Sequence, residues 1–152
     1  MADDLMKLYQ DVVLAHNRQP HNFVEVDPAT HRGHGYNPLC GDRIELTLDV
    51  RNGVIAAIGF QGESCAIATA SASLLTTTLE GRSVDDALAV MDAFNRTLDG
   101  DETAVVPETL QPLLAVRAFP SRLKCAGLPW ASLSAALADD DAAASTEQGQ
   151  GT

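Results

Sequence analysis

Three cysteines and a neighbouring aspartate are the residues of this chain best suited to metal or sulfur chemistry. Cys40, Cys65 and Cys125 lie far apart in the sequence, and Asp42 follows Cys40 by two residues. Thiolates are soft ligands that favour zinc or an iron–sulfur cluster over hard cations. Three thiolates and one carboxylate would complete the tetrahedral set that a zinc ion needs. These four residues are therefore the candidate metal ligands.

The cysteines alone leave a plainer interpretation open. A single cysteine is most often a small buried apolar residue, and the chain has no Cys-x-x-Cys pair of the kind found in many zinc sites. An odd number of cysteines cannot pair completely within one chain, and their wide spacing is unlike a dense disulfide framework. That usage is typical of a reducing compartment, in which thiols are kept for chemistry or metal binding.

The predicted strands and helices begin close to these residues. Residues 43–50 alternate polar and apolar side chains, which indicates a half-buried strand, and Asn52-Gly53 predicts a hairpin turn into a second strand over residues 54–60. Apolar spacing and capping signals predict helices over residues 5–17, 65–80, 83–98, 107–116 and 120–138. This order indicates an α+β domain whose element ends cluster, so that the four candidate ligands can converge.

Composition and charge narrow the class of partner. Ten Lys and Arg against 21 Asp and Glu give a net charge of −11, which argues against nucleic acid or anionic lipid because phosphate binding needs clustered basic residues. No apolar run approaches the roughly 18 residues of a membrane span, and the acidic N-terminus lacks a signal-peptide pattern. We expect a cytoplasmic protein with no membrane partner. Residues 1–138 form the predicted single domain, and the acidic, polar residues 139–152 are expected to be disordered.

Segments around all three cysteines carry a family resemblance. Residues 37–42, 62–73 and 119–126, together with the pattern His16-x-x-x-Pro20-x-Asn22, resemble the IscU/NifU-like family of iron–sulfur cluster assembly proteins. The resemblance extends from about residue 8 to residue 137. It implies an IscU/SufU-like fold, in which a small antiparallel sheet of about three strands is covered by an N-terminal helix and several C-terminal helices.

Two features resemble the SufU-type branch of that family, whose members are zinc-dependent sulfurtransferases. Lys124 precedes the third cysteine where the scaffold members have histidine, and an extra acidic helical stretch covers residues 85–108. The resemblance implies a Zn²⁺ ion held by Cys40, Asp42, Cys65 and Cys125. It also implies that Cys40 is the catalytic persulfide acceptor.

The resemblance implies partners as well. The sulfur donor would be a SufS-type, pyridoxal-phosphate-dependent cysteine desulfurase, and a downstream Suf scaffold or another acceptor would receive the sulfur. A four-ligand zinc site is closed, so we expect that one ligand must leave for transfer and that a partner residue replaces Cys40.

Two other functions stay open at this point. The same ligands would hold a transient iron–sulfur cluster in an assembly scaffold, and they would equally hold a zinc ion that only stabilises the fold. His31 and His34, near Cys40, are expected to be solvated rather than metal ligands. Arg122 and Lys124 are near enough to Cys125 to offset the negative charge of the ligand set, and no further role is assigned to them.

Two local features depart from the family pattern. Pro129 lacks the N–H that would bond to the carbonyl of Cys125, so we predict a kink or a helix restart at the third cysteine. Residues 30–37 should supply an edge strand by family analogy, yet His31-Arg32-Gly33-His34-Gly35-Tyr36 is a poor strand sequence on its own.

Overall fold

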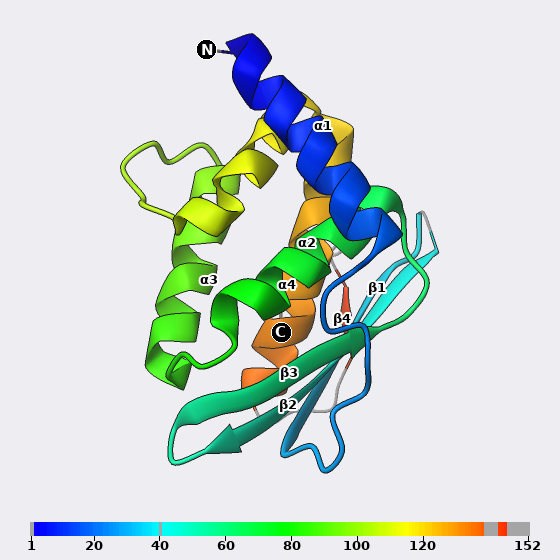
Figure 1. The fold of residues 1–152 in the computed structure, drawn as a ribbon, viewed down its shortest axis with the longest axis vertical. Coiled ribbons are helices and arrows are strands. Elements are labelled where there is room, and N and C mark those ends of the chain that lie inside the picture. The colour runs from blue at the N-terminus through cyan, green and yellow to red at the C-terminus, as the bar shows by residue number, and fades with distance from the viewer. Residues whose placement is uncertain (1, 40, 139–142, 146–152) are drawn as a thin grey trace.

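A computed structural model describes residues 2–39, 41–138 and 143–145 of the chain (Figure 1). The predicted α+β class is confirmed, because three consecutive strands form the body of one sheet and a run of helices follows them. Cys40 lies outside the described residues. The elements in chain order are α1 (Ala2–Arg18), β1 (His31–Asn37), β2 (Asp42–Arg51), β3 (Val54–Gln61), α2 (Ala66–Leu79), α3 (Val84–Leu98), the 3₁₀ helices η1 (Glu108–Ala118) and η2 (Pro120–Arg122), α4 (Leu123–Leu137) and β4 (Ala143–Ser145).

The sheet is built on the hairpin that the sequence predicts. Strands β2 and β3 pair antiparallel, and Asn52 and Gly53 turn the chain between them at positive φ angles of 52° and 75°. Such angles suit the tight turn whose twist matches that of the flanking strands. The full strand order is β3-β2-β1-β4, and the inward residues of β2, among them Ile44, Leu46 and Leu48, are fully buried in the core.

Strand β1 forms despite its weak strand sequence. It pairs antiparallel with β2 along its whole length, and helix α4 packs on the same two strands. A Cβ atom on Gly33 would overlap the carbonyl oxygen of Ser132, and one on Gly35 would overlap the hydroxyl of Ser132. The glycines that weaken the strand pattern are therefore the residues that allow α4 to lie close against the sheet.

Strand β4 differs from the expected disorder of the tail. Residues Ala143–Ser145 pair parallel with His34–Tyr36 of β1, on the edge opposite β2. An open edge presents unpaired N–H and C=O groups, so a short extended segment of small residues can satisfy them. The rest of the predicted tail, residues 139–142 and 146–152, lies outside the described residues.

Helix α4 does not restart after the third cysteine, so the restart predicted there is wrong, and the alternative of a kink stays a prediction. It is a single α-helix from Leu123 to Leu137 with Pro129 inside it, and it begins after the short 3₁₀ turn η2. The proline removes one hydrogen bond, to the Cys125 carbonyl, but Leu128, Trp130 and Leu133 around it are fully buried. Tertiary packing of this face holds the helix through the missing bond.

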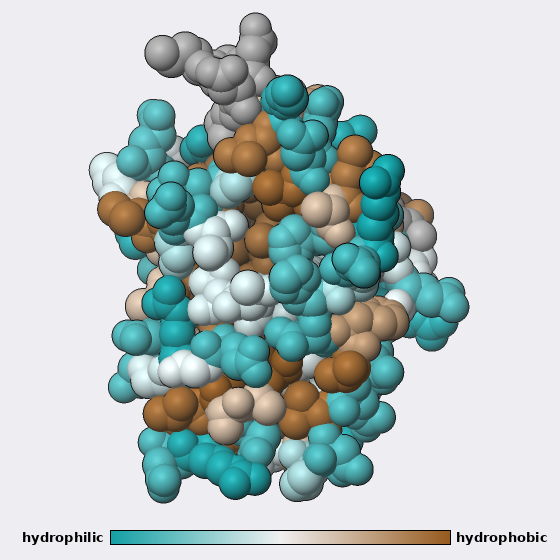
Figure 2. All heavy atoms as spheres, in the orientation of Figure 1, coloured by the Kyte–Doolittle hydropathy of each residue, from teal (hydrophilic) through white to brown (hydrophobic). Residues whose placement is uncertain are grey.

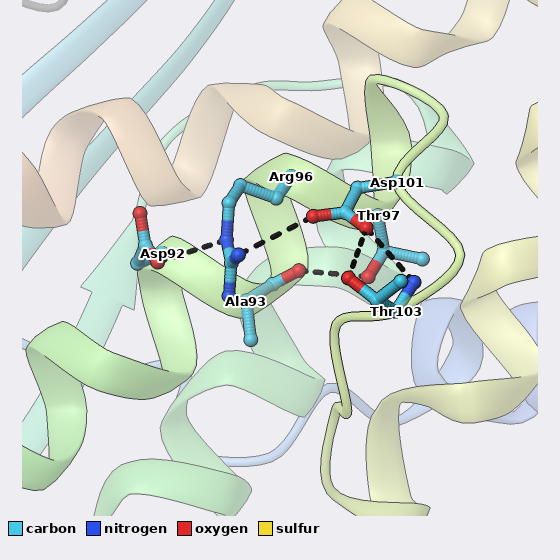
Figure 3. Close-up of polar contacts among 6 residues, drawn as sticks. All are labelled: Asp92, Ala93, Arg96, Thr97, Asp101 and Thr103. Atoms are coloured by element: carbon cyan, nitrogen blue, oxygen red, sulfur yellow. Dashed lines mark hydrogen bonds and ion pairs between the residues drawn. The ribbon is translucent and has the colours of Figure 1, made fainter.

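The remaining helices form a group beside the sheet (Figure 1), with α3 at the left of the view and β1 at the right. The acidic stretch predicted over residues 85–108 is α3 and the loop that follows it. Arg96 pairs with Asp92 on the helix and with Asp101 in the loop, and Asp101 also accepts hydrogen bonds from the backbone N–H and hydroxyl of Thr103 (Figure 3). These contacts fold the loop back onto the end of α3.

One face of the molecule is mostly hydrophilic, as the polar composition of the chain predicts. Hydrophilic side chains cover most of the face drawn in Figure 2, and hydrophobic residues interrupt them in separate patches. Within the described part of the chain, none of the helices has the length and apolar character needed to span a membrane.

Candidate metal centre

Three of the four candidate ligands converge at the ends of three elements. Asp42 begins β2, Cys65 is the N-cap residue of α2, and Cys125 lies in the first turn of α4. One carboxylate oxygen of Asp42 and the Sγ atoms of the two cysteines all lie within 4.8 Å of one another. Asp42 and Cys125 are buried, and Cys65 is half-buried. The predicted clustering of element ends is therefore present in the fold.

The β2–β3 hairpin explains how residues so far apart meet. Strand β3 returns the chain to the start of β2, where the N–H of Arg43 donates to the carbonyl of Glu63 at 2.8 Å. Cys65 follows two residues later, and its N–H donates to Oδ1 of Asp42 at 3.1 Å. Helix α4 packs on β1 and β2 and brings Cys125 to the same place.

The fourth candidate ligand, Cys40, belongs in the sequence to the short segment between Asn37 and Asp42. Asn37 makes two hydrogen bonds within this segment, because its side-chain oxygen accepts from the N–H of Leu39 at 3.1 Å and its carbonyl accepts from the N–H of Gly41 at 2.8 Å. These two bonds fix the described residues on either side of Cys40, which itself lies outside the described part of the chain.

Asp42 has one oxygen engaged and one without a partner. Oδ1 accepts the N–H of Cys65, whereas Oδ2 is buried and has no hydrogen-bond partner among the described residues. A buried carboxylate oxygen without a partner carries a large desolvation cost. A cation bound between Asp42 and the two cysteines would satisfy this oxygen.

The thiol of Cys65 sits in a mixed electrostatic environment. Burial raises the pKa of the Cys65 thiol, and the charge of Asp42 acts in the same direction, while the N–H of Ala68 and the contact with Cys125 oppose the shift. The Ala68 N–H donates to Sγ at 3.4 Å, which makes Cys65 a thiol N-cap. Without a cation this thiol keeps its proton, and a cation would favour the thiolate.

The donor set and spacing fit a zinc ion. With Zn–S bonds of about 2.3 Å, ligand atoms of a tetrahedral site lie roughly 3.8 Å apart. The observed spread of up to 4.8 Å exceeds this by an amount that small side-chain rotations can supply. Asp42, Cys65 and Cys125 give three ligands, and tetrahedral zinc needs one more.

The charged and histidine side chains that are close to the candidate ligands in the sequence make contacts of their own. The Arg122 guanidinium stacks on the Phe119 ring at 4.8 Å, and Lys124 is exposed on α4. His34 Nε2 lies 3.3 Å from an oxygen of Glu45, and His31 Nδ1 contacts the Thr30 hydroxyl at 2.8 Å. Among the described residues, neither histidine belongs to the group formed by Asp42 and the two cysteines.

Polar anchors on α2 are a feature that the sequence analysis did not identify. The Ser73 hydroxyl contacts His16 Nδ1 and accepts the N–H of His21, both at 2.7 Å, which ties α1 and the following segment to α2. Ser71 bonds to α4. The only signal in the sequence is that serines replace alanines on the small-residue face of a buried helix.

Comparisons with known proteins agree with this fold. Residues 8–139 match the NifU-like N-terminal domain. The iron–sulfur cluster assembly scaffold protein IscU of Streptococcus pyogenes is 36% identical over 135 residues, which cover 88% of this chain and 84% of that protein. The zinc-dependent sulfurtransferase SufU of Bacillus subtilis is 31% identical over 140 residues, which cover 91% of this chain and 95% of that protein.

Solved structures give the same picture. The crystal structure of a putative iron–sulfur cluster assembly scaffold protein for the SUF system from Fervidobacterium islandicum superposes with a TM-score of 0.77 at 25% identity, over 86% of this chain and 97% of that chain. A NifU-like protein from Brucella abortus has the same TM-score at 20% identity, over 91% of this chain and 96% of that chain, which shows the shared fold.

Proposed function

The chain belongs to the NifU-like N-terminal domain family, whose members act in iron–sulfur cluster assembly, and we propose that it is a zinc-dependent sulfurtransferase. The observation that carries the proposal is the pairing of an unsatisfied buried oxygen on Asp42 with two thiols, Cys65 and Cys125, within 4.8 Å. Together with Cys40 these residues make a three-thiolate, one-carboxylate set, which suits zinc.

Each ligand contributes through its own position. The Cys65 N–H fixes the orientation of the Asp42 carboxylate, and the Ala68 N–H supports the negative charge on Cys65 Sγ. The first turn of α2 adds the favourable end of a helix dipole to that thiolate. When bound, zinc would keep all of these cysteines as thiolates at neutral pH.

Cys40 is the residue proposed to carry the sulfur. In the sequence it stands between the exposed Leu39 and the buried Asp42, whereas Cys125 is buried in α4. The Cys40 thiolate attacks the terminal sulfur of a cysteine persulfide on the donor. A new S–S bond forms on Cys40, the S–S bond of the donor breaks, and the donor cysteine leaves as a thiolate, so that no external oxidant or reductant is needed.

The proposed donor is a SufS-type cysteine desulfurase, and a Suf scaffold or another thiol acceptor would take the sulfur next. This follows from the similarity to a protein named as a zinc-dependent sulfurtransferase. Lys124 supports the same choice, because a protonated lysine has no lone pair for a metal, and scaffold members of the family have histidine at this position.

An iron–sulfur scaffold is the second candidate function. The relative named as a scaffold has the higher identity, 36% against 31%, and covers a similar share of the chain. The same ligands would then hold a transient cluster instead of a resident zinc ion. A third candidate is a zinc domain whose metal only stabilises the fold.

Metal analysis and a coupled assay separate the three candidates. The protein is purified aerobically, its zinc and iron are measured, and it is added to a SufS-type desulfurase with cysteine as substrate. The proposal predicts one zinc per chain and faster alanine release with the wild type, but no acceleration with Cys40→Ala. A labile brown cluster would support the scaffold, and bound zinc without acceleration would support the structural role. Unchanged acceleration by Cys40→Ala would overturn the assignment of Cys40.

A further inference from the structure

Ser71 joins the two helices that carry Cys65 and Cys125. Its Oγ lies 2.6 Å from the carbonyl oxygen of Ala126, and Nε1 of Trp130 lies 3.2 Å from the same Oγ. Ser71, Ala126 and Trp130 are all fully buried. The three residues therefore form a polar link between α2 and α4 inside the core.

The chemistry of the groups allows one arrangement of protons. An indole N–H only donates, and a carbonyl oxygen only accepts. Ser71 consequently accepts from Trp130 and donates its single hydroxyl proton to Ala126. Every member is satisfied, and a complete network in a low-dielectric core favours one relative position of its elements.

The link lies next to the metal centre along both helices. Ala126 is the residue after Cys125, and Ser71 lies six residues after Cys65, which is about 9 Å along the axis of α2. The bond from Ser71 to the Ala126 carbonyl therefore holds the first turn of α4 against α2 at the residue that follows Cys125.

We propose that Ser71 and Trp130 are positioning residues of the metal centre, which fix α4 on α2 and so set the separation of the Cys65 and Cys125 Sγ atoms. The inference rests on the proposed function because it assumes that these two thiols bind zinc together. The side chains of Ser71 and Trp130 act on the metal centre through the relative position of the two helices.

The test compares Ser71→Ala with a matched control on the same helix. The buried Thr78 also makes a hydroxyl contact from α2 to another element, at 2.7 Å to the exposed Thr109 of η1, but near the end of α2 that is far from Cys65. Thr78→Val removes that contact without changing side-chain size. The full-length proteins are titrated with zinc against a competing chelator, and urea unfolding of the metal-free forms records the loss of stability in each variant.

We expect zinc affinity to fall about tenfold in Ser71→Ala, the lower end of the effect of residues that orient metal ligands, and to stay within about twofold in Thr78→Val. Trp130→Phe keeps the bond from Ser71 to Ala126 and should give a smaller loss of affinity than Ser71→Ala. A shifted d–d absorption spectrum after Co²⁺ substitution of Ser71→Ala, but not of Thr78→Val, would show the change in ligand geometry directly. Equal losses of affinity in Ser71→Ala and Thr78→Val, or none in either, would overturn the proposal.

A second readout separates this inference from the proposed function. If the wild type binds no zinc, the proposed function fails, and the positioning role is judged on the metal-free chain. In a Cys40→Ser background only Cys65 and Cys125 remain, so diamide oxidation reports how readily their sulfur atoms meet. Disulfide formation slowed severalfold by Ser71→Ala and not by Thr78→Val supports the positioning role, and equal rates reject it.

Discussion

The two carboxylate oxygens of Asp42 have different surroundings, and this difference separates a metal ligand from a structural aspartate. Oδ1 is used by the Cys65 N–H, and Oδ2 is buried without a partner among the described residues. An aspartate whose task was only to cap the turn before α2 would gain nothing from burying the second oxygen. The different surroundings of the two Asp42 oxygens therefore favour a cation bound to Oδ2.

The Asp42→Asn variant tests this reasoning because it should lower the zinc affinity without lowering the stability of the metal-free protein. The amide keeps an oxygen for the Cys65 N–H but replaces the unpaired anionic oxygen. We expect zinc affinity to fall at least tenfold, while the free energy of unfolding of the metal-free protein stays within about 1 kcal/mol of wild type or rises. Chelator competition and urea unfolding measure the two effects.

Asp49→Asn is the matched control for that variant. Asp49 is also a buried acid on β2, but it pairs with Arg51 at 2.9 Å and lies at the other end of the strand. Its zinc affinity should equal that of wild type. A metal-free Asp42→Asn protein that is several kcal/mol less stable than wild type would indicate a structural aspartate instead.

His16 gives the structure a pH response that does not involve the metal ligands. Burial lowers the pKa of His16, and the nearby His21 adds to the shift. The ring stacks on His21 at 4.8 Å, and its Nδ1 contacts the Ser73 hydroxyl. The pKa of His16 is therefore lower in the folded state than in the unfolded chain, where it has its ordinary value of about 6.5.

The sign of this effect on stability follows from proton linkage. Well above pH 6.5 His16 is neutral in both the folded and the unfolded state, and its contribution to the free energy of unfolding is fully present. As the pH falls from about 6.5 through the lowered folded pKa, the unfolded state binds more protons and stability is lost. Chelated wild type should lose more stability between pH 7.5 and 5.5 than His16→Gln does, by urea unfolding. Equal losses in the two proteins would contradict the assignment.

At the scale of elements, the sequence predicted correctly those features that depend on neighbouring residues alone. The alternation over residues 43–50 became β2, Asn52-Gly53 became the hairpin turn, and Ser83 became the N-cap of α3. The paths of β1 and α4 could not be predicted in this way, because both depend on packing between distant segments. Gly33 and Gly35 form a strand because α4 lies on them, and Pro129 stays helical because its neighbours are buried.

In the candidate site, too, the local sequence predicts some features and the packing of distant segments determines the others. Residue type and position next to element ends were enough to predict that Asp42, Cys65 and Cys125 converge. The link from Ser71 to Ala126 and Trp130 crosses more than fifty residues and leaves no local pattern in the sequence. Whether Cys40 joins the group stays a prediction, because it lies outside the described residues.

A pair of glycine substitutions tests the packing of α4 on β1. In Gly33→Ala the new Cβ meets the Ser132 carbonyl and the backbone of Ala136, which cannot move independently of the helix. We expect a loss of about 1–3 kcal/mol in unfolding free energy. Gly127→Ala in α4 has nothing within 4 Å of the new Cβ and should gain about 0.5–1 kcal/mol through helix propensity. Urea unfolding of the metal-free proteins measures both, and a neutral Gly33→Ala would contradict the close packing.

For the whole molecule, the candidate site would affect stability because it joins one strand, β2, to two helices, α2 and α4. One candidate ligand begins a strand, one is the N-cap of α2 and one lies in the first turn of α4, so that a metal bound by all three would close long loops. The unfolded chain cannot hold the ligands in this arrangement, and the free energy of binding therefore stabilises the fold. A ligand present at a thousand times its dissociation constant adds about 4 kcal/mol.

Removal of zinc should consequently lower the thermal stability of the entire domain. For a chain of this size, 1 kcal/mol corresponds to roughly 2–4 °C, so chelation should reduce the melting temperature by about 8–16 °C in one cooperative transition. Differential scanning calorimetry with and without a chelator measures the shift, and added zinc should restore it. Cys125→Ser removes one ligand and should melt at the same temperature in both conditions. A zinc-loaded wild type that melts unchanged after chelation, or a shift that survives in Cys125→Ser, would place the metal elsewhere, because a ligand held by Asp42, Cys65 and Cys125 must couple all three elements.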